Sequence, residues 1–185
     1  GTWHFVAQPS VTGGPTFSSA SFGSKSSIRF TAASSQFFQV SSDTTISQPF
    51  CFYSVIKTTG INEGAWGWNN GANGGSVQSF NVDPNWILST TASPVVHCSW
   101  GFWHNILVLF NTTSSHFFVE AFDELGALDA GITGISNTAA MLWGHDRINF
   151  LNNNSVEFAL YNSDITSNAT ALNTNITGYW GALPA

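Results

Sequence analysis

The sequence predicts an all-β fold built from two packed antiparallel sheets, and three observations support this prediction. Apolar residues alternate with polar ones, or form short runs, over segments of about five to eight residues, which is typical of many short strands. Gly, Asn, Ser, Pro and Asp separate these segments, as turn residues do. The chain has 185 residues, enough for one domain with a sizeable core, so residues 1–185 are expected to form a single β-sandwich.

The expected strands follow the clearest of these segments in chain order. They are residues 27–30, 36–40, 50–57, 76–82, 103–110, 116–122 and 155–162. Segment 103–110 (WHNILVLF) is apolar on both faces of the pleat and predicts a central strand covered on both sides. Segment 155–162 alternates, with Val156, Phe158 and Leu160 expected on one face. Two packed sheets account for both patterns.

One short helix is expected near the C-terminus. Apolar residues recur there at helical spacing behind Ser163 and Asp164, either of which can cap the first turn. The recurring residues are Ile165, Ala169, Leu172, Ile176 and Tyr179. Such an amphipathic helix is expected to fold back onto the sandwich.

Composition excludes several classes of partner. Only 8% of the residues are charged, and the net charge is −6 with four Lys and Arg together, so a basic surface for nucleic acid or for anionic lipid is absent from the sequence. The longest apolar run, residues 106–110, is far shorter than the roughly 18 residues that span a bilayer. The chain begins without Met, which suggests a domain excised from a larger protein.

Three phrases, in this order, resemble the laminin-G-like or concanavalin A-like lectin and glucanase jelly roll. They are residues 27–57 (SIRFTAASS to SVIK), residues 100–126 (WGFWHNILVLF to FDELG) and residues 155–181 (SVEFALYN to GYWG). The family occurs in secreted bacterial proteins and in bacteriophage virion proteins. The resemblance implies a jelly-roll sandwich, but that fold hosts lectins, glycosidases and structural modules, so a role must be argued from a site.

The stretch HFFVEAFDEL (116–125) raises the hypothesis of a glycosidase. Retaining glycosidases need two carboxyl groups about 5 to 5.5 Å apart, and the laminarinase-like relatives carry acidic residues at three alternating strand positions. Here Glu120 and Glu124 have that spacing, but Phe122 occupies the middle position. The expected structure is therefore the second arm of a hairpin with a turn beginning at Asp123, without catalytic residues, and Glu157 is expected to anchor a loop.

No cofactor is expected, and calcium is the alternative left open. The five histidines (His4, His97, His104, His116 and His145) show no spacing of a zinc motif. Residues 144–149 (GHDRIN) and 81–85 (NVDPN) offer oxygen ligands for calcium, but neither has the dense acidic pattern of a calcium loop. Cys51 and Cys98 permit one disulfide, although each lies in an apolar run typical of buried free thiols.

Carbohydrate binding is the function that the sequence favours. Sugars are bound by exposed aromatic rings together with amides and short polar groups, and this needs little charge. Trp66 and Trp68 are two residues apart, so their indoles share one face of a strand and form either a binding surface or part of the core. The candidate binding residues are Trp66, Trp68, Asn69, Asn70, Asn73 and Trp86.

These observations predict a non-catalytic, lectin-like domain of an extracellular or virion surface protein, with a surface glycan as its partner. The alternative is a structural or decoration module that assembles with other copies or with other domains of its parent chain. A glycoside hydrolase is the weaker alternative.

Overall fold

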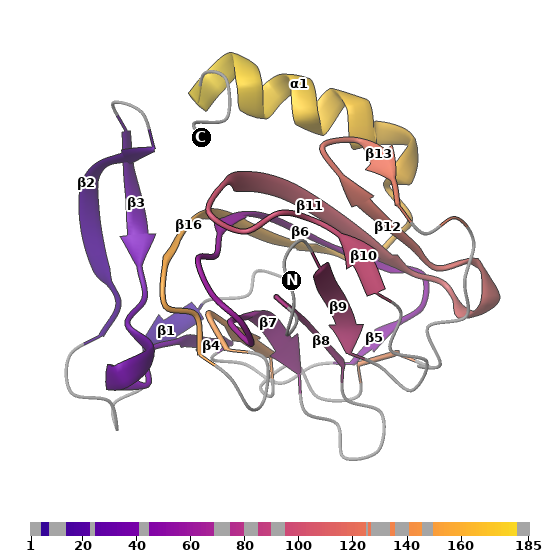
Figure 1. The fold of residues 1–185 in the computed structure, drawn as a ribbon. Coiled ribbons are helices and arrows are strands. Elements are labelled where there is room, and N and C mark those ends of the chain that lie inside the picture. Colours follow the sequence, from indigo (N-terminus) through magenta and orange to yellow (C-terminus); the bar gives the residue numbers. More distant parts are fainter. Residues whose placement is uncertain are drawn as a thin grey trace.

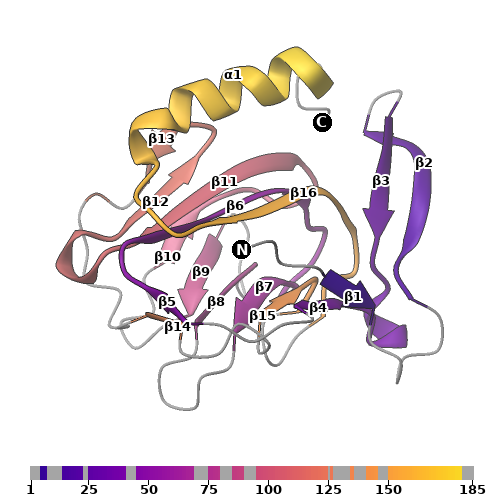
Figure 2. The same cartoon turned by 180° about the vertical axis from the view of Figure 1, so that it is seen from behind.

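The computed structural model describes residues 5–7, 14–22, 25–40, 45–68, 75–79, 85–89, 95–124, 126, 134–135, 141–145 and 150–180. These residues form two seven-stranded antiparallel sheets that pack face to face, with one α-helix on the outer side of the second sheet (Figures 1 and 2). The predicted two-sheet β-sandwich with a short C-terminal helix is confirmed.

The first sheet has the strand order β1-β4-β15-β7-β8-β9-β10. Its strands are β1 (Phe5–Ala7), β4 (Phe38–Val40), β15 (Met141–Trp143), β7 (Gly64–Trp68), β8 (Gly75–Ser79), β9 (Asn85–Ser89) and β10 (Val95–His97). The short strands β5 (Ile46–Ser47) and β14 (Gly134–Ile135) pair with each other outside both large sheets.

The second sheet has the strand order β13-β12-β11-β6-β16-β3-β2. Its strands are β13 (Phe122–Asp123), β12 (His116–Val119), β11 (Trp103–Phe110), β6 (Phe50–Lys57), β16 (Asn154–Tyr161), β3 (Lys25–Arg29) and β2 (Thr16–Phe22). The β2–β3 hairpin stands at one side of the sandwich and reaches toward the C-terminal end of the helix in both views (Figures 1 and 2).

The central strands β6 and β11 contribute side chains from their two faces to two different hydrophobic clusters. On β6, Phe50, Phe52 and Ile56 belong to the cluster between the sheets, whereas Cys51 and Tyr53 belong to the cluster beneath the helix. This double burial confirms that segment 103–110, like segment 50–57, forms a central strand covered on both sides. Because both faces lose contact with water, burial of these two strands contributes to the stability of both clusters.

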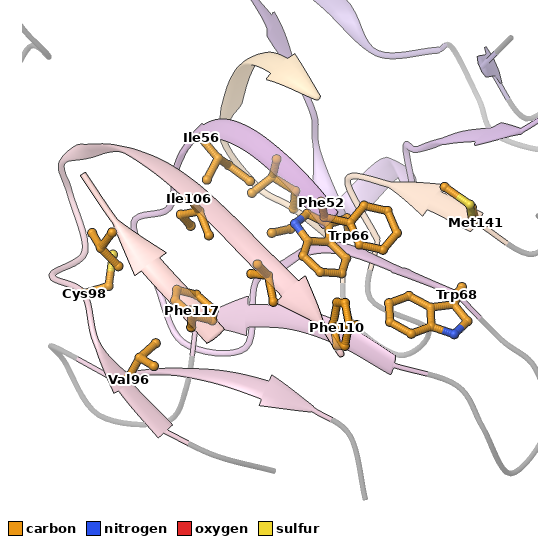
Figure 3. Close-up of a cluster of buried hydrophobic side chains, with 14 of the residues drawn as sticks. Phe52, Ile56, Trp66, Trp68, Val96, Cys98, Ile106, Phe110, Phe117 and Met141 are labelled. Carbon is orange, nitrogen blue, oxygen red and sulfur yellow. The ribbon is translucent and has the colours of Figure 1, made fainter. Parts of the chain in front are cut away.

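Trp66 and Trp68 lie in the cluster between the sheets (Figure 3). Their exposed fractions are 1% and 0%, and the Trp66 ring stacks on Phe52 with 4.0 Å between ring centroids. The two indoles do share one strand face, and that face points into the core between the sheets. The prediction that these two residues form an exposed sugar-binding surface is therefore wrong.

Strand β16 departs from regular alternation at its start. Its register with β6 shifts between Ser155 and Glu157, so Val156 is the extra residue of a β-bulge. Phe158 and Leu160 pack against the cluster between the sheets, as expected, but Val156 packs against the cluster beneath the helix. The prediction that all three side chains share a face is wrong at Val156, because the bulge reverses the alternation there.

The segment 116–122 is not one strand. Strand β12 ends at Val119, and Val119 pairs with Phe122 across a two-residue turn in which Glu120 and Ala121 both have positive φ angles, of 52° and 71°. Segment 116–119 is the second arm of the β11–β12 hairpin, as expected. The predicted position of the following turn, at Asp123, is wrong, because the chain already reverses at Glu120 and Asp123 lies in β13.

The helix α1 (Ala169–Trp180) follows a 3-10 turn at Thr166–Asn168. The Asp164 carboxylate accepts hydrogen bonds from the backbone N–H and the hydroxyl of Thr166, at 2.9 and 2.7 Å. Ile165 and not Ser163 or Asp164 occupies the N-cap position of the 3-10 turn, so the predicted cap is wrong, and Asp164 instead holds the turn that precedes the helix. Ile176 is buried against the outer face of the second sheet, which confirms that the helix folds back onto the sandwich. Tyr179, by contrast, is exposed.

The two cysteines are free thiols in different clusters. Cys51 lies beneath the helix and Cys98 between the sheets, and both are buried. Burial raises the pKa of Cys51 to about 11, an effect that a backbone hydrogen bond from Ile165 partly offsets. The thiol of Cys51 therefore stays protonated at neutral pH.

A candidate carbohydrate-binding groove

A groove of about 370 Å³ runs along β16 between that strand and α1. The pairing of β3 with β16 covers only the first two residues of β16, Asn154 and Ser155, and the groove begins where this pairing ends. The residues that line it are Tyr53, Trp143, Val156, Glu157, Phe158, Ala159, Tyr161, Leu172, Asn175 and Ile176. The groove thus combines aromatic rings, phenol hydroxyls, one carboxylate, one amide and aliphatic side chains.

The β-bulge creates one wall of this groove. Because Val156 is the extra residue, Val156 and Glu157 both line the groove although they are neighbours in the chain. The buried Ser155 hydroxyl donates to the carbonyl oxygen of Val55 at 2.9 Å and accepts from the indole N–H of Trp143 at 3.2 Å. Ser155 therefore stabilises the bulge and also fixes Trp143, which stacks on Phe158 with 5.6 Å between ring centroids.

Glu157 lies close to two phenols. Burial raises the pKa of Tyr53 well above its usual range, and the negative charge of Glu157 raises it further. Burial also raises the pKa of Tyr161, again with a smaller contribution from Glu157. Both phenols consequently keep their O–H groups at neutral pH, so both can donate hydrogen bonds.

The Tyr53 hydroxyl is buried and forms no hydrogen bond with any other residue in the part of the chain that the structure describes. Tyr53 as a whole is 2% exposed. A buried polar group without a partner costs about 1 to 3 kcal/mol, and such groups are uncommon enough to require an explanation. Tyr53 belongs to the cluster beneath the helix and also lines the groove, near the Glu157 charge.

The opposite wall is α1, which supplies Leu172, Asn175 and Ile176. Asn173 holds this helix on the sheet, because its side-chain oxygen accepts a hydrogen bond from the Asn105 amide of β11 at 2.6 Å. The Asn173 amide also donates to the Glu120 carbonyl oxygen at 3.4 Å. Polar contacts and the buried Ile176 side chain thus set the width of the groove.

A second hollow of about 460 Å³ lies beside the loop between β6 and β7, next to Phe150 and Asn152. The buried Glu63 carboxylate accepts hydrogen bonds from the backbone N–H groups of Thr59, at 3.1 Å, and Asn152, at 3.4 Å. Burial raises the pKa of Glu63, and these hydrogen bonds partly offset the rise. Since its oxygens already bind two backbone segments, Glu63 fastens the loop, and this hollow is a weaker candidate for a ligand.

The other predicted binding residues are not part of the groove as described. Asn69, Asn70 and Asn73 lie outside the described residues, as does most of the two candidate calcium segments. Trp86 lies on β9, but its side chain is not among those described, so its role stays a prediction. Within the part of the chain that the structure describes, no cluster of three or more His, Cys, Asp and Glu side chains is arranged to hold a metal ion.

The acidic stretch that raised the glycosidase hypothesis does not line the groove. The Glu120 carboxylate lies 2.9 Å from Nδ1 of His104, whose Nε2 lies 2.9 Å from the Ser99 carbonyl oxygen. Glu124 is exposed beyond β13. Glu157 is the one carboxylate among the groove-lining residues, so the groove lacks the pair that a glycosidase of the usual kind requires.

No protein-family model matches the chain, and no curated protein matches it significantly. Solved structures do resemble it. The binding domain of Paraclostridial Mosquitocidal Protein 1 aligns with a TM-score of 0.63 and 14% identity over 96% of this chain and 50% of that one. The botulinum neurotoxin serotype G binding domain aligns with a TM-score of 0.65 and 8% identity over 96% and 49%.

A third structure is similar in size. Domain 4 of AbnA, a GH43 extracellular arabinanase from Geobacillus stearothermophilus solved with arabinotriose, aligns with a TM-score of 0.60 and 9% identity over 93% of this chain and 81% of that one. The chain has a β-sandwich jelly-roll fold. At these identities the likeness concerns the fold alone, and the chain spans only about half the length of the two toxin binding domains.

Sequence reasoning did not find the groove. The predicted strand and helix do contain Glu157, Tyr161 and the groove residues of α1. However, the alternating pattern placed Val156 on the wrong face of the strand. It also gave no indication that β3 pairs with only the first two residues of β16. The one usable signal was the carboxylate Glu157 within an otherwise apolar strand, beside Tyr161. A carboxylate in such a strand needs either a partner or a ligand.

Proposed function

We propose that this domain binds a carbohydrate without cleaving it, and that the groove between β16 and α1 is its binding site. The observation that carries the proposal is the composition of the groove, where Trp143 and Tyr161 supply aromatic surface beside the carboxylate of Glu157 and the amide of Asn175. Aromatic rings bind the apolar C–H faces of sugars, while carboxylate and amide groups bind their hydroxyls. The third solved structure, a jelly-roll domain in complex with arabinotriose, supports the proposal by its fold.

We place the domain in an extracellular or virion surface protein, within the laminin-G-like branch of the jelly rolls. The low content of charged residues and the many neutral polar ones support an exposed setting. In the part of the chain that the structure describes, no helix is long and apolar enough to cross a membrane.

The test is a glycan array that includes arabinan, glucan, mannan and galactan fragments as well as sialylated chains. The parent domain is expected to bind a defined subset, and Tyr161→Ala is expected to weaken this binding about tenfold or more, because it removes an aromatic wall of the groove. Tyr179→Ala is the matched control, since Tyr179 is an exposed tyrosine outside the groove. Binding that Tyr161→Ala leaves unchanged would place the site elsewhere.

An assembly module is the second candidate function, favoured by strand β2. In the described part of the second sheet β2 is the last strand, its sequence TFSSASF carries no charge, and Phe17 is 85% exposed. Uncharged edge strands of this kind pair readily with other chains. Two results together would favour assembly over sugar binding. The first is the absence of binding to any glycan on the array, and the second is a concentration-dependent oligomer in analytical ultracentrifugation that Phe17→Lys abolishes.

A further inference from the structure

The imidazole of His104 contacts two hydrogen-bond acceptors at once. Its Nδ1 lies 2.9 Å from the Glu120 carboxylate, and its Nε2 lies 2.9 Å from the Ser99 carbonyl oxygen. Neither a carbonyl oxygen nor an ionised carboxylate can donate a hydrogen bond, whereas a neutral imidazole carries a single N–H. The two contacts together therefore require one proton more than a neutral histidine and an ionised glutamate hold.

Glu120 lies in the two-residue turn between β12 and β13, and the backbone of this turn is strained. Glu120 and Ala121 both have φ angles in the left-handed region, which residues with a Cβ seldom adopt. The Glu120 N–H donates to the Asn105 carbonyl oxygen at 3.1 Å, and the Asn173 amide of α1 donates to the Glu120 carbonyl oxygen at 3.4 Å. Of these three contacts that hold the turn, the one with His104 depends on a proton.

His104 lies on the inner face of β11, because it pairs with Ile56, a member of the cluster between the sheets. Lys57 pairs with Trp103, which belongs to the cluster beneath the helix, so Lys57 lies on the opposite face of the sheet. Within the described part of the chain, Glu120 is the charged group in hydrogen-bond contact with His104. The other ionisable groups on the adjoining segments are Glu63 after β6, His97 and Cys98 at the end of β10, and His116 and Asp123, which bind each other.

We infer that His104 and Glu120 form a pH-sensitive latch, that this geometry is its protonated state, and that loss of one proton to solvent releases Glu120 from the imidazole. The neutral ring keeps its N–H on Nε2 for the Ser99 carbonyl, so Nδ1 presents a lone pair to the carboxylate. Glu120 is the group that leaves, because its side chain is already 40% exposed and regains water. The strained turn then loses one of its three contacts and holds α1 less firmly.

The experiment is an NMR titration of the full chain across the range in which histidines titrate, about pH 5 to 8. The imidazole nitrogen shifts of His104 distinguish the doubly protonated ring from each neutral tautomer. Amide hydrogen exchange, corrected for its intrinsic pH dependence, follows the Glu120 N–H. We expect His104 to change from the doubly protonated ring to the Nε2–H tautomer. Protection of the Glu120 N–H should fall in the same transition by about twofold to fivefold, the effect of losing a partly exposed ion pair.

Glu120→Gln is the decisive variant. A glutamine amide donates to Nδ1 while Nε2–H still donates to Ser99, so a neutral imidazole satisfies both contacts and the protection of the turn should no longer change with pH. Asp123→Asn is the matched control, because it removes the same charge from the neighbouring His116 pair, where Nδ1 lies 2.7 Å from the carboxylate. A neutral His116 with its N–H on Nδ1 already satisfies that contact, so this variant should keep the transition at Glu120. Thermal unfolding shows whether each variant keeps the fold.

Three outcomes would overturn the latch. The first is a titration of His104 in the parent protein that leaves the protection of the Glu120 N–H unchanged, a result that requires no variant. The second is a transition at the turn that persists in Glu120→Gln, and the third is its loss in a folded Asp123→Asn protein. The latch does not depend on a ligand, so a glycan array without any binding would overturn the proposed function and leave this inference standing.

Discussion

Trp66 is held by several aromatic rings at once. Besides Phe52, it lies 6.0 Å from Trp68 and 6.2 Å from Phe110, measured between ring centroids. Its indole N–H is buried and forms no hydrogen bond within the described part of the chain. The residue therefore contributes through packing and apolar burial rather than through a polar contact.

We predict that Trp66→Ala lowers the free energy of unfolding by about 3 to 5 kcal/mol, the range measured for removal of large buried aromatics. Trp66→Phe keeps an aromatic ring and removes the buried N–H without a partner, so its cost should be clearly smaller. Urea denaturation followed by circular dichroism measures both. A Trp66→Ala protein with unchanged stability but reduced glycan binding would contradict the core assignment.

Single residues also show where sequence patterns lose information. A spacing of two placed Trp66 and Trp68 on one face, which is correct, because alternation is a local property of an extended chain. Whether that face meets solvent or the other sheet depends on how the two sheets pack on each other. That packing brings together residues far apart in the chain, which alternation cannot reveal.

At the scale of the element, β16 joins the two halves of the proposed site. Its first two residues pair with β3, its bulge turns Val156 and Glu157 toward the groove, and its later residues pair with β6. The Ser155 hydroxyl links this strand to Val55 and to Trp143. Bulges are common beside binding sites because they change the direction of side chains.

We predict that Ser155→Ala destabilises the protein by about 1 to 3 kcal/mol, because the Val55 carbonyl and the Trp143 indole N–H both lose a buried partner. The same change should weaken glycan binding, since Trp143 lines the groove. Denaturant unfolding and array binding are the two measurements. Ser163→Ala, at an exposed serine just beyond β16, is the control. A loss of stability without any change in binding would show that Trp143 does not contact the ligand.

The elements themselves were predicted unevenly. Long, strongly apolar segments became β6 and β11 with the expected bounds, because burial on both faces leaves a clear pattern. Strand β2, with its Ser-rich sequence, was not expected, since its pairing with β3 rather than its own hydrophobicity makes it a strand. The bulge could not be predicted either, because a strand that contains one extra residue shows the same kind of sequence pattern as a regular strand.

For the whole molecule, the fold class followed from many weak local signals that agree, while the groove brings together four elements that are distant in the chain. Tyr53, Trp143, Glu157 and Leu172 come from β6, β15, β16 and α1, and their arrangement depends on the strand order and on how the helix packs. Composition alone excluded partners that need a basic surface, and it agreed with a surface glycan as the expected partner.

The stability of the whole molecule should depend on pH through Glu63, which ties the β6–β7 loop to Asn152. Because its pKa is raised in the folded protein, the folded state holds a proton that the unfolded chain has already released. This holds at any pH between the ordinary glutamate value of about 4.3 and the raised one. Within this window the free energy of unfolding falls as pH rises. The group therefore stabilises the fold most at the acidic end and least above its raised pKa.

We predict that Glu63→Gln removes this dependence. The stability of the variant relative to the parent protein should increase as pH rises through the window and become constant above it. Chemical denaturation at a series of pH values from about 4 to 8 measures the difference. Glu124→Gln changes the charge equally at an exposed site and is the control. A relative stability that stays constant for Glu63→Gln, or that falls with rising pH, would show that the folded protein does not hold the proton on this carboxylate.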